Sequence, residues 1–117
     1  MTAYKSGEVL LVPFPFTDLT DAKQRPAVVL SSSHFNQIHQ DVIIAAITSH
    51  LTRATIKDDY QLTAVEQVSA GLPKPSIVKL GKVTTLDQRL IRRRLGRLPP
   101  KSMRRLIAVF SKIFQDI

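Results

Sequence analysis

The stretch Val42–Ser49, VIIAAITS, decides the fold of this chain. It is almost continuously apolar and opens with three β-branched residues in a row. A strand with one face in water alternates apolar and polar residues, whereas a strand that is buried on both faces is apolar throughout. We therefore expect Val42–Ser49 to be a central strand that is covered on both sides.

Shorter segments around it also have strand character. Glu8–Phe14 follows Gly7 and should end at Pro13 and Pro15, because proline cannot donate a hydrogen bond to a sheet. The polar segment Pro15–Gln24 is expected to be a loop of about ten residues. Further strands are expected over Ala27–Leu30, Tyr60–Thr63 (a short edge strand), Ser76–Leu86 with a bulge at Gly81, and Leu95–Leu98. Ser31–Ser33 and Asp87 should each cap a short turn.

The end of the chain predicts an amphipathic helix. Pro100 suits a first helical turn, and apolar residues then recur at helical spacing: Met103, Leu106, Ile107, Phe110, Ile113 and Phe114. This stripe should be mainly core, with some contact in a dimer. Short strands and a closing helix favour a mainly β fold, a small antiparallel barrel with a helix packed on it. The length predicts one domain over residues 1–117, and pairing with a second copy would bury more of its surface.

The charge is unevenly distributed. Seventeen Lys and Arg residues oppose nine Asp and Glu, for a net charge of +8. The segment Arg89–Arg105 contains eight basic residues and no acidic one. Such a patch favours polyanionic partners, but it does not by itself distinguish RNA from DNA or from an acidic protein.

The composition also excludes several classes of protein. There is no cysteine, so disulfides and thiolate metal sites are excluded, and the spacing of His34, His39 and His50 matches no metal motif. We therefore expect no metal and no cofactor. No apolar run reaches the roughly 18 residues of a membrane span, and the N-terminus does not read as a signal peptide. The expected location is the cytoplasm.

Three segments, in this order, resemble the MazF/PemK (Kid) toxin family. They are Gly7–Phe16, similar to the family's opening strand, Lys23–Leu30, which contains its Arg-Pro step, and Ile43–Ser49, similar to its central strand ending in Thr-Ser. Weaker similarities follow at Gly71-Leu72, Ser76–Val78, Thr85–Asp87 and Leu95–Leu98. The resemblance implies an SH3-like barrel of the MazF/PemK/CcdB toxin type and a homodimer. It also implies sequence-selective, metal-independent cleavage of single-stranded RNA, and an acidic antitoxin as partner.

The resemblance also implies roles for individual residues. Arg25 would be the main electrostatic catalyst and a proton donor or relay, Thr48 would orient the phosphate or assist proton transfer, and Ser49 would add a polar contact. A planar, permanently charged guanidinium suits a phosphate that gains charge during reaction. The expected RNA-binding residues are Phe16, Lys23, His50, Arg53 and Lys79.

Several alternatives remain open at this level. An isolated Arg-Pro is often a surface arginine before a turn, Thr-Ser at a strand end is often a turn cap, and Lys79 is equally well an exposed strand lysine. Some relatives carry an acid where this chain has Gly81, which can serve as neither acid nor base. The same barrel could instead belong to a non-catalytic toxin that binds a protein such as DNA gyrase, or to a basic nucleic-acid-binding module.

Overall fold

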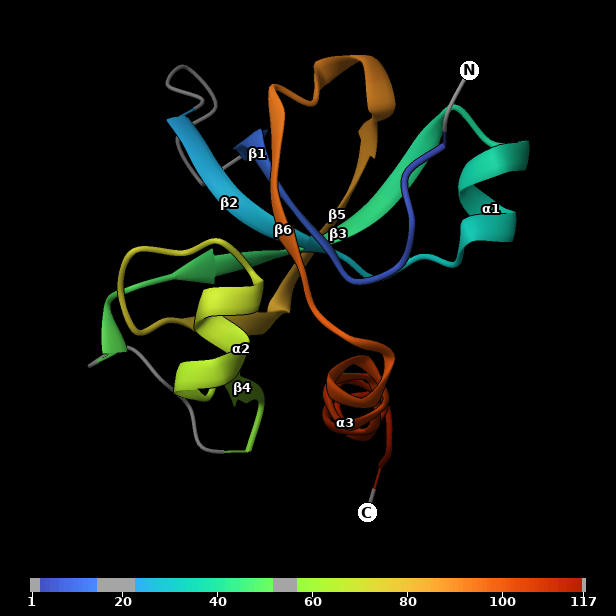
Figure 1. The fold of residues 1–117 in the computed structure, drawn as a ribbon. Coiled ribbons are helices and arrows are strands. Elements are labelled where there is room, and N and C mark those ends of the chain that lie inside the picture. Colours follow the sequence, from blue (N-terminus) through green and yellow to red (C-terminus); the bar gives the residue numbers. More distant parts are fainter. Residues whose placement is uncertain (1–2, 15–22, 52–56, 117) are drawn as a thin grey trace.

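In the part of the chain that the structure describes, six strands form one antiparallel sheet around the predicted central strand. The computed structural model describes residues 3–14, 23–51 and 57–116. Its elements are β1 (Glu8–Phe14), β2 (Lys23–Val29), α1 (Ser33–Ile38), β3 (Asp41–Thr48), β4 (Asp59–Gln61), α2 (Ala64–Ser69), β5 (Ile77–Asp87), the 3-10 turn η2 (Gln88–Leu90), β6 (Arg93–Arg97) and α3 (Pro100–Lys112) (Figure 1). The strand order is β4-β5-β3-β2-β1-β6. β4 and β6 are therefore the two edges of a curled sheet that forms half of a barrel.

β3 is central and buried on both faces, as its apolar sequence predicts. Alternate residues of the strands enter two separate cores. One core lies on the α3 side and includes Val9, Val28, Ala45, Ile47, Val78, Leu80, Met103 and Leu106. The other lies on the opposite face and includes Leu10, Val12, Phe14, Ala27, Val29, Val42, Ile44, Ala46 and Leu86. The mainly β barrel with a C-terminal helix is therefore confirmed.

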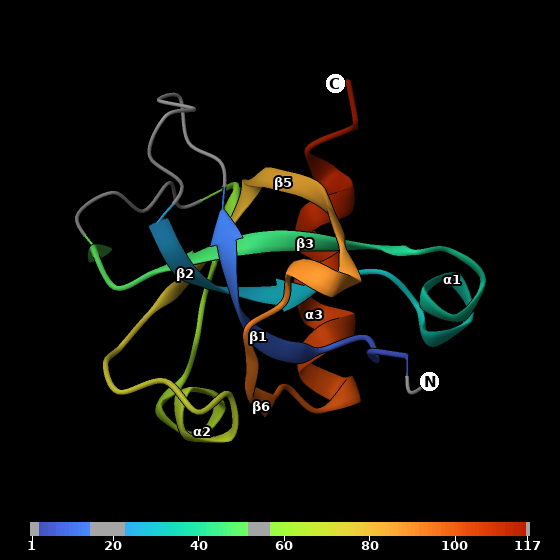
Figure 2. The same ribbon diagram turned by 90° about the horizontal axis from the view of Figure 1, so that it is seen from above.

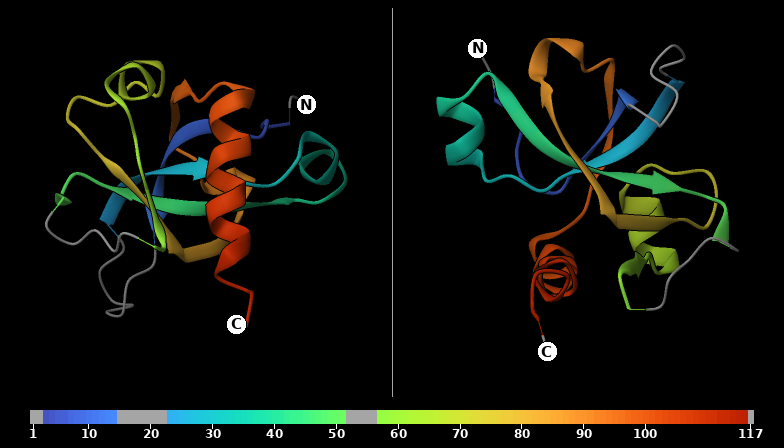
Figure 3. Two further views of the ribbon diagram at one scale, coloured as in Figure 1. Left: turned by 90° about the horizontal axis from the view of Figure 1, so that it is seen from below. Right: turned by 180° about the vertical axis from the view of Figure 1, so that it is seen from behind.

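The predicted bulge at Gly81 is present, and it bends β5. Ala45 of β3 is paired with Val83, whereas the next residue, Ala46, is paired with Lys79, so the residues between Lys79 and Val83 have no partner on β3. An insertion of this kind increases local twist. The resulting curl is visible from above in Figure 2 and from below in Figure 3, where α3 crosses the sheet between α1 and α2.

The predicted strand Glu8–Phe14 is confirmed as β1, and Pro13 lies within it, paired with Gln24. One expectation about the elements was wrong, and one helix was missed. Lys23 and Gln24 accordingly belong to β2 and not to the predicted loop, whose residues 15–22 are outside the described part of the chain. The helix α2 was not predicted. Its valines, Val65 and Val68, are 79% and 77% exposed, so the helix lacks the buried apolar stripe by which a helix is found in a sequence.

A capping box starts α2, and this motif could have been found in the sequence. The Thr63 side chain accepts a hydrogen bond from the Glu66 N–H at 3.1 Å, and Glu66 Oε1 accepts one from the Thr63 N–H at 2.9 Å. Gly71 follows the C-cap Ala70 of this helix and has φ +71°. A Cβ there would lie 1.9 Å from the Leu95 carbonyl oxygen, and a Cβ on Gly96 would lie 2.4 Å from that of Ser69. The end of α2 and strand β6 therefore meet backbone to backbone.

Only part of the apolar stripe of α3 is core. Met103 and Leu106 are buried, and Val109 and Phe110 pack against the same cluster. Ile107 and Ile113 are more than a third exposed, and Phe114 is 72% exposed. None of the helices in the described ranges is long and apolar enough to cross a membrane.

Glu66 joins β4, α2 and α3 through one buried carboxylate. Its Oε2 accepts a hydrogen bond from the Tyr60 hydroxyl at 2.7 Å and is paired with the Arg105 guanidinium at 3.4 Å. Burial alone would raise the pKa of Glu66. The hydrogen bonds that it accepts, from the Ser102 hydroxyl, the Thr63 N–H, Tyr60 and Arg105, outweigh this effect and lower its pKa.

We predict that Glu66→Gln lowers the free energy of unfolding at pH 7 by about 1–3 kcal/mol, the usual cost of losing buried hydrogen bonds to a charged group. Because the folded pKa is below the unfolded one, the carboxylate stabilises the fold above about pH 4.3. Its contribution is lost as the pH falls through the folded pKa. Denaturant unfolding at several pH values should therefore show the difference between wild type and variant shrinking below that pH. Asp116→Asn, at an exposed position, is the control, and an equal pH dependence in both variants would contradict the prediction.

Candidate functional site

Arg25 and Thr48 are brought together by the pairing of β2 with β3. Ala27 and Ala46 are directly opposite each other on these antiparallel strands. Arg25 and Thr48 each lie two residues further toward the same end, so both side chains are on the face that carries Ala27 and Ala46. Both residues line the same two adjoining hollows. The expected convergence of a guanidinium and a hydroxyl is thus compatible with the fold.

The smaller hollow is strongly basic. It has a volume of about 90 Å³ and is lined by Arg25, Ala46, Ile47, Thr48, His50, Lys79 and Lys82. We call it the cationic pocket. Its charged lining residues are one arginine and two lysines, drawn from two different strands. A small cavity with several cations and a hydroxyl is suited to an anion such as a phosphate.

The larger hollow extends the cationic pocket toward β6. It has a volume of about 280 Å³ and shares Arg25, Ile47, Thr48 and His50 with the pocket. We call it the groove. Its other lining residues are Leu11, Pro26, Ser49, Gly71, Leu72, Pro73, Lys74, Ser76, Arg93 and Leu95. The backbone contact between the end of α2 and β6 lies in this wall, since Gly71 and Leu95 are among its residues.

Thr48 both caps a turn and lines the site. Its Oγ1 accepts a hydrogen bond from the His50 N–H at 3.1 Å, which is the turn-capping role typical of threonine at a strand end. A hydroxyl keeps one donor and a second acceptor site when it accepts a single bond. The turn cap therefore holds Thr48 in place without excluding a contact to a ligand.

Lys79 lines the cationic pocket and belongs to a largely buried ion pair. Its Nζ lies 2.9 Å from Oδ2 of Asp59, and the two side chains are 17% and 5% exposed. The residues are directly opposite each other on β5 and β4. Lys79 is thus not the exposed strand lysine of the alternative interpretation. Asp59 was missed by sequence reasoning, because it stands in a polar stretch whose pairing with β5 cannot be seen in the sequence.

The other expected site residues are dispersed. Ser49 lines the groove but not the cationic pocket, and His50 is exposed and lines both. Lys23 is exposed at the start of β2, and neither hollow includes it. Phe16 and Arg53 lie outside the described residues. Gly81 is exposed, and a Cβ built on it would have nothing within 4 Å.

The basic cluster at positions 92–94 is divided by the fold. Arg93 lines the groove. Arg94 instead forms an ion pair with the buried Glu8 carboxylate, and its guanidinium lies 5.6 Å from the centre of the Tyr4 ring. One arginine of the cluster is therefore placed for ligand binding, while its neighbour is part of the structure around β1.

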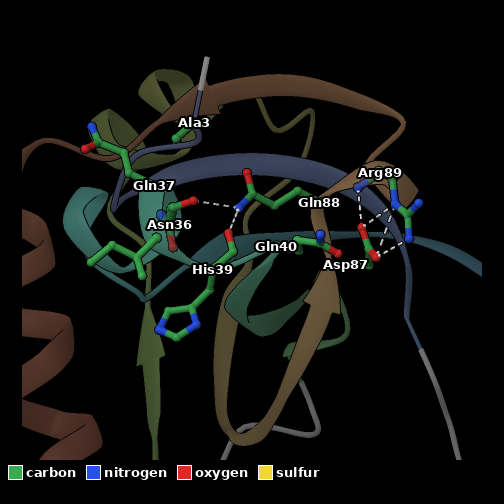
Figure 4. Close-up of a pocket in the computed structure, with 9 residues that line it drawn as sticks. Ala3, Asn36, Gln37, His39, Gln40, Asp87, Gln88 and Arg89 are labelled. Carbon is green, nitrogen blue, oxygen red and sulfur yellow. Dashed lines mark hydrogen bonds and ion pairs between the residues drawn. The ribbon is translucent and has the colours of Figure 1, made fainter. Parts of the chain in front are cut away.

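A further pocket, of about 330 Å³, lies between α1 and η2 at the other end of β3 (Figure 4). Several of its polar side chains bind one another or the nearby backbone. Gln88 Nε2 donates to the backbone oxygens of Asn36 at 2.8 Å and His39 at 3.0 Å, and Arg89 pairs with Asp87 at 2.8 Å. We assign this region to fastening α1 onto η2. In the described part of the chain, no three His, Asp or Glu residues are grouped closely enough to hold a metal ion.

Comparison with known proteins identifies the family. The model of the PemK-like, MazF-like toxins of type II toxin-antitoxin systems matches residues 5–114. The chain is 30% identical over 80 residues to the endoribonuclease MazF of Staphylococcus saprophyticus. That match covers 68% of this chain and 64% of the length of the relative.

Solved structures have the same fold. An endoribonuclease from a mycobacterial species superposes with a TM-score of 0.75 at 21% identity, over 97% of this chain and 93% of that one. A mycobacterial endoribonuclease in complex with its cognate antitoxin gives 0.75 at 19% identity, over 96% and 95%. MazF from Deinococcus radiodurans gives 0.74 at 18% identity, over 96% of both chains. With a family model that spans nearly the whole sequence and this shared fold, the chain belongs to the PemK-like, MazF-like toxins of type II toxin-antitoxin systems.

Proposed function

We propose that this chain is a sequence-selective endoribonuclease that cleaves single-stranded mRNA in the cytoplasm without a metal ion. The observation that carries the proposal is the cationic pocket, where Arg25 and Thr48 of adjacent strands line one cavity together with Lys79 and Lys82. Family membership supports the same activity. RNA brings its own nucleophile, so a protein that aligns a phosphate and stabilises its added charge can accelerate cleavage without a cofactor.

The reaction proceeds by internal displacement at phosphorus. The ribose 2′-oxygen loses its proton to a base and forms a bond to phosphorus, while the bond from phosphorus to the 5′-oxygen breaks and that oxygen takes up a proton. The products are a 2′,3′-cyclic phosphate and a 5′-hydroxyl. Arg25 binds the non-bridging oxygens as they gain charge, and the Thr48 hydroxyl orients the phosphate. His50 lines both hollows and is the candidate proton acceptor.

The groove binds the RNA on one side of the cleaved bond. Arg93 and Lys74 line its far part and provide two further positive charges. Both are exposed at the surface, so their contribution is electrostatic and weakens with salt. Unpaired nucleotides fit this description, because a strand without a partner can enter a narrow cavity that a duplex cannot.

We predict that Arg25→Ala lowers kcat about 10²–10³-fold, the usual loss when one group that stabilises the transition-state charge is removed. Arg25→Lys should recover only part of the rate, because an ammonium cannot bind two phosphate oxygens at once. The measurement is cleavage of a long single-stranded RNA in EDTA, with the ends of the products mapped. Arg89→Ala is the control, since Arg89 is exposed within η2 and paired locally with Asp87.

Three outcomes, from that assay and from a separate gyrase reaction, would contradict the proposed function or the role of Arg25. Cleavage that persists in Arg25→Ala would show that Arg25 takes no part in the chemistry. RNA that is bound tightly but stays intact would indicate a basic nucleic-acid-binding barrel. Intact RNA together with a stalled gyrase reaction would indicate a toxin that acts on a protein.

Arg93 and Arg94 should respond differently to substitution. We predict that Arg93→Ala raises KM and leaves kcat unchanged. It should also lower the slope of log K for RNA binding against log salt concentration by about one, the effect of losing one phosphate contact. Arg94→Ala should instead lower the thermal unfolding temperature, because the buried Glu8 carboxylate loses its positively charged partner. Steady-state kinetics at several salt concentrations and thermal unfolding separate the two effects. Identical behaviour of the two variants in both measurements would contradict the assignment.

We further propose that the chain forms a homodimer and binds an acidic antitoxin whose tail occupies the groove. The net charge of +8 and the cationic lining of the site favour an acidic segment there. An acidic tail would then compete with RNA. In sedimentation experiments the wild-type protein should have twice the mass of one chain. The protein encoded by a neighbouring reading frame should inhibit cleavage competitively, and inhibition that does not depend on RNA concentration would place its binding site elsewhere.

A further inference from the structure

The carboxylate of Asp59 lies behind Lys79 with respect to the cationic pocket. Lys79 lines the pocket, whereas Asp59 is not among the lining residues and is only 5% exposed. The two charged groups are 2.9 Å apart and come from directly opposed residues of β4 and β5. Going inward from the edge strand β4, the structure therefore places the buried carboxylate of Asp59 first, then Lys79, then the cationic pocket.

Stability alone is a poor explanation for this pair. Removing two charges from water is costly, and the attraction between them often only compensates for that cost. Replacing a buried ion pair by apolar residues of similar size is often neutral or even stabilising. Lys79 of this buried pair also borders the cationic pocket, which suggests that the direction of the lysine matters for what the pocket binds.

We propose that Asp59 is a positioning residue that directs the Lys79 ammonium at the phosphate bound in the cationic pocket. An ammonium has three N–H donors, so a carboxylate that accepts from one of them fixes the direction of the others. This inference rests on the proposed ribonuclease function and assigns to it a residue outside the lining of the site.

Asp59 has two opposite effects on the reaction. As a negative charge close to the pocket, it weakens the attraction for RNA before reaction. As an anchor for Lys79, it improves the alignment of a cation with the phosphate in the transition state. Removing its charge while keeping its shape should therefore lower kcat and leave KM unchanged or lower. Because a loss of folded protein also lowers the apparent kcat at unchanged KM, kcat is calculated per folded protein, with the folded fraction of each variant measured by circular dichroism.

The test is Asp59→Asn, assayed for cleavage of a single-stranded RNA and for binding of the same RNA with 2′-O-methyl groups, which cannot be cleaved. We expect kcat to fall about tenfold or more, since a displaced catalytic group can cost up to about 10²-fold, and binding of the uncleavable RNA to be at least as tight as in wild type. Asp58→Asn is the matched control, because it makes the same chemical change at the exposed neighbouring residue. It should behave as wild type.

A double variant shows whether Asp59 acts through Lys79. Lys79→Gln alone should lower kcat by a similar factor, and adding Asp59→Asn to it should change kcat less than twofold, because the residue being positioned is already absent. Multiplicative losses would overturn the inference. If Asp59→Asn fails to fold, Asp59→Glu takes its place. It keeps the charge and displaces it by one methylene, so it should lower kcat with KM unchanged, and a wild-type kcat would overturn the inference.

The outcomes separate this inference from the function on which it rests. Wild-type protein that leaves RNA intact would overturn the proposed function and this inference with it. Wild-type cleavage together with an unchanged kcat in Asp59→Asn would overturn the inference alone. A raised KM with normal kcat would also overturn it, because Asp59 would then act in RNA binding and not in the alignment of Lys79.

Discussion

The antiparallel pairing of β3 with β2 on one side and β5 on the other is the constraint on which the site depends. It places Ala27, Ala46 and Lys79 in one row across three strands. Because side chains alternate between the faces of a strand, the same register puts Arg25 and Thr48 on the face that carries this row. A slip of one residue in either pairing would move a cation or the hydroxyl to the other face. The apolar residues that fill both cores hold that register.

The electrostatics of the site follow from where the sheet buries charge. Arg25 and Lys82 are exposed members of the cationic pocket, while Lys79 is largely covered and has a buried acid behind it. The bulge around Gly81 separates Lys79 from Lys82 along β5, and both nevertheless line the same cavity. The irregularity in β5 therefore belongs to the construction of the pocket as well as to the curl of the sheet.

Much of the fold can be read from the sequence because burial leaves a periodic signal. Val42–Ser49 and the first half of the α3 stripe were predicted from that signal, and the turn caps at Ser32 and Asp87 from local side-chain chemistry. Pairing leaves no such signal. Gln24 was expected in the loop after β1, but it pairs with Pro13, because a proline can occupy a strand where its nitrogen is not required as a donor. α2 was missed because its exposed valines show no apolar face, although the Thr63–Glu66 capping box was visible.

The same holds for the candidate site: some of its residues could be predicted from the sequence, but the contacts made by strand pairing could not. Arg25 and Thr48 could be named from the resemblance, and the structure brings them to one cavity. The Asp59–Lys79 pair could not be named, because its members are 20 residues apart and meet only through the register of β4 and β5. The separation of Arg93 from Arg94 likewise depends on which strand face each side chain occupies and on the position of Glu8.

The close approach at Gly71 and Gly96 has a consequence for how this scaffold can diversify. Where two backbones touch with no room for a Cβ, the distance between them is independent of side-chain identity. The position of that wall of the groove is therefore fixed by the backbone, and substitutions there cannot change the width of the groove in small steps. Variants that accept different ligands must arise from residues that face into the groove, such as Pro73 and Lys74, which an engineer could randomise while the glycine contact preserves the frame.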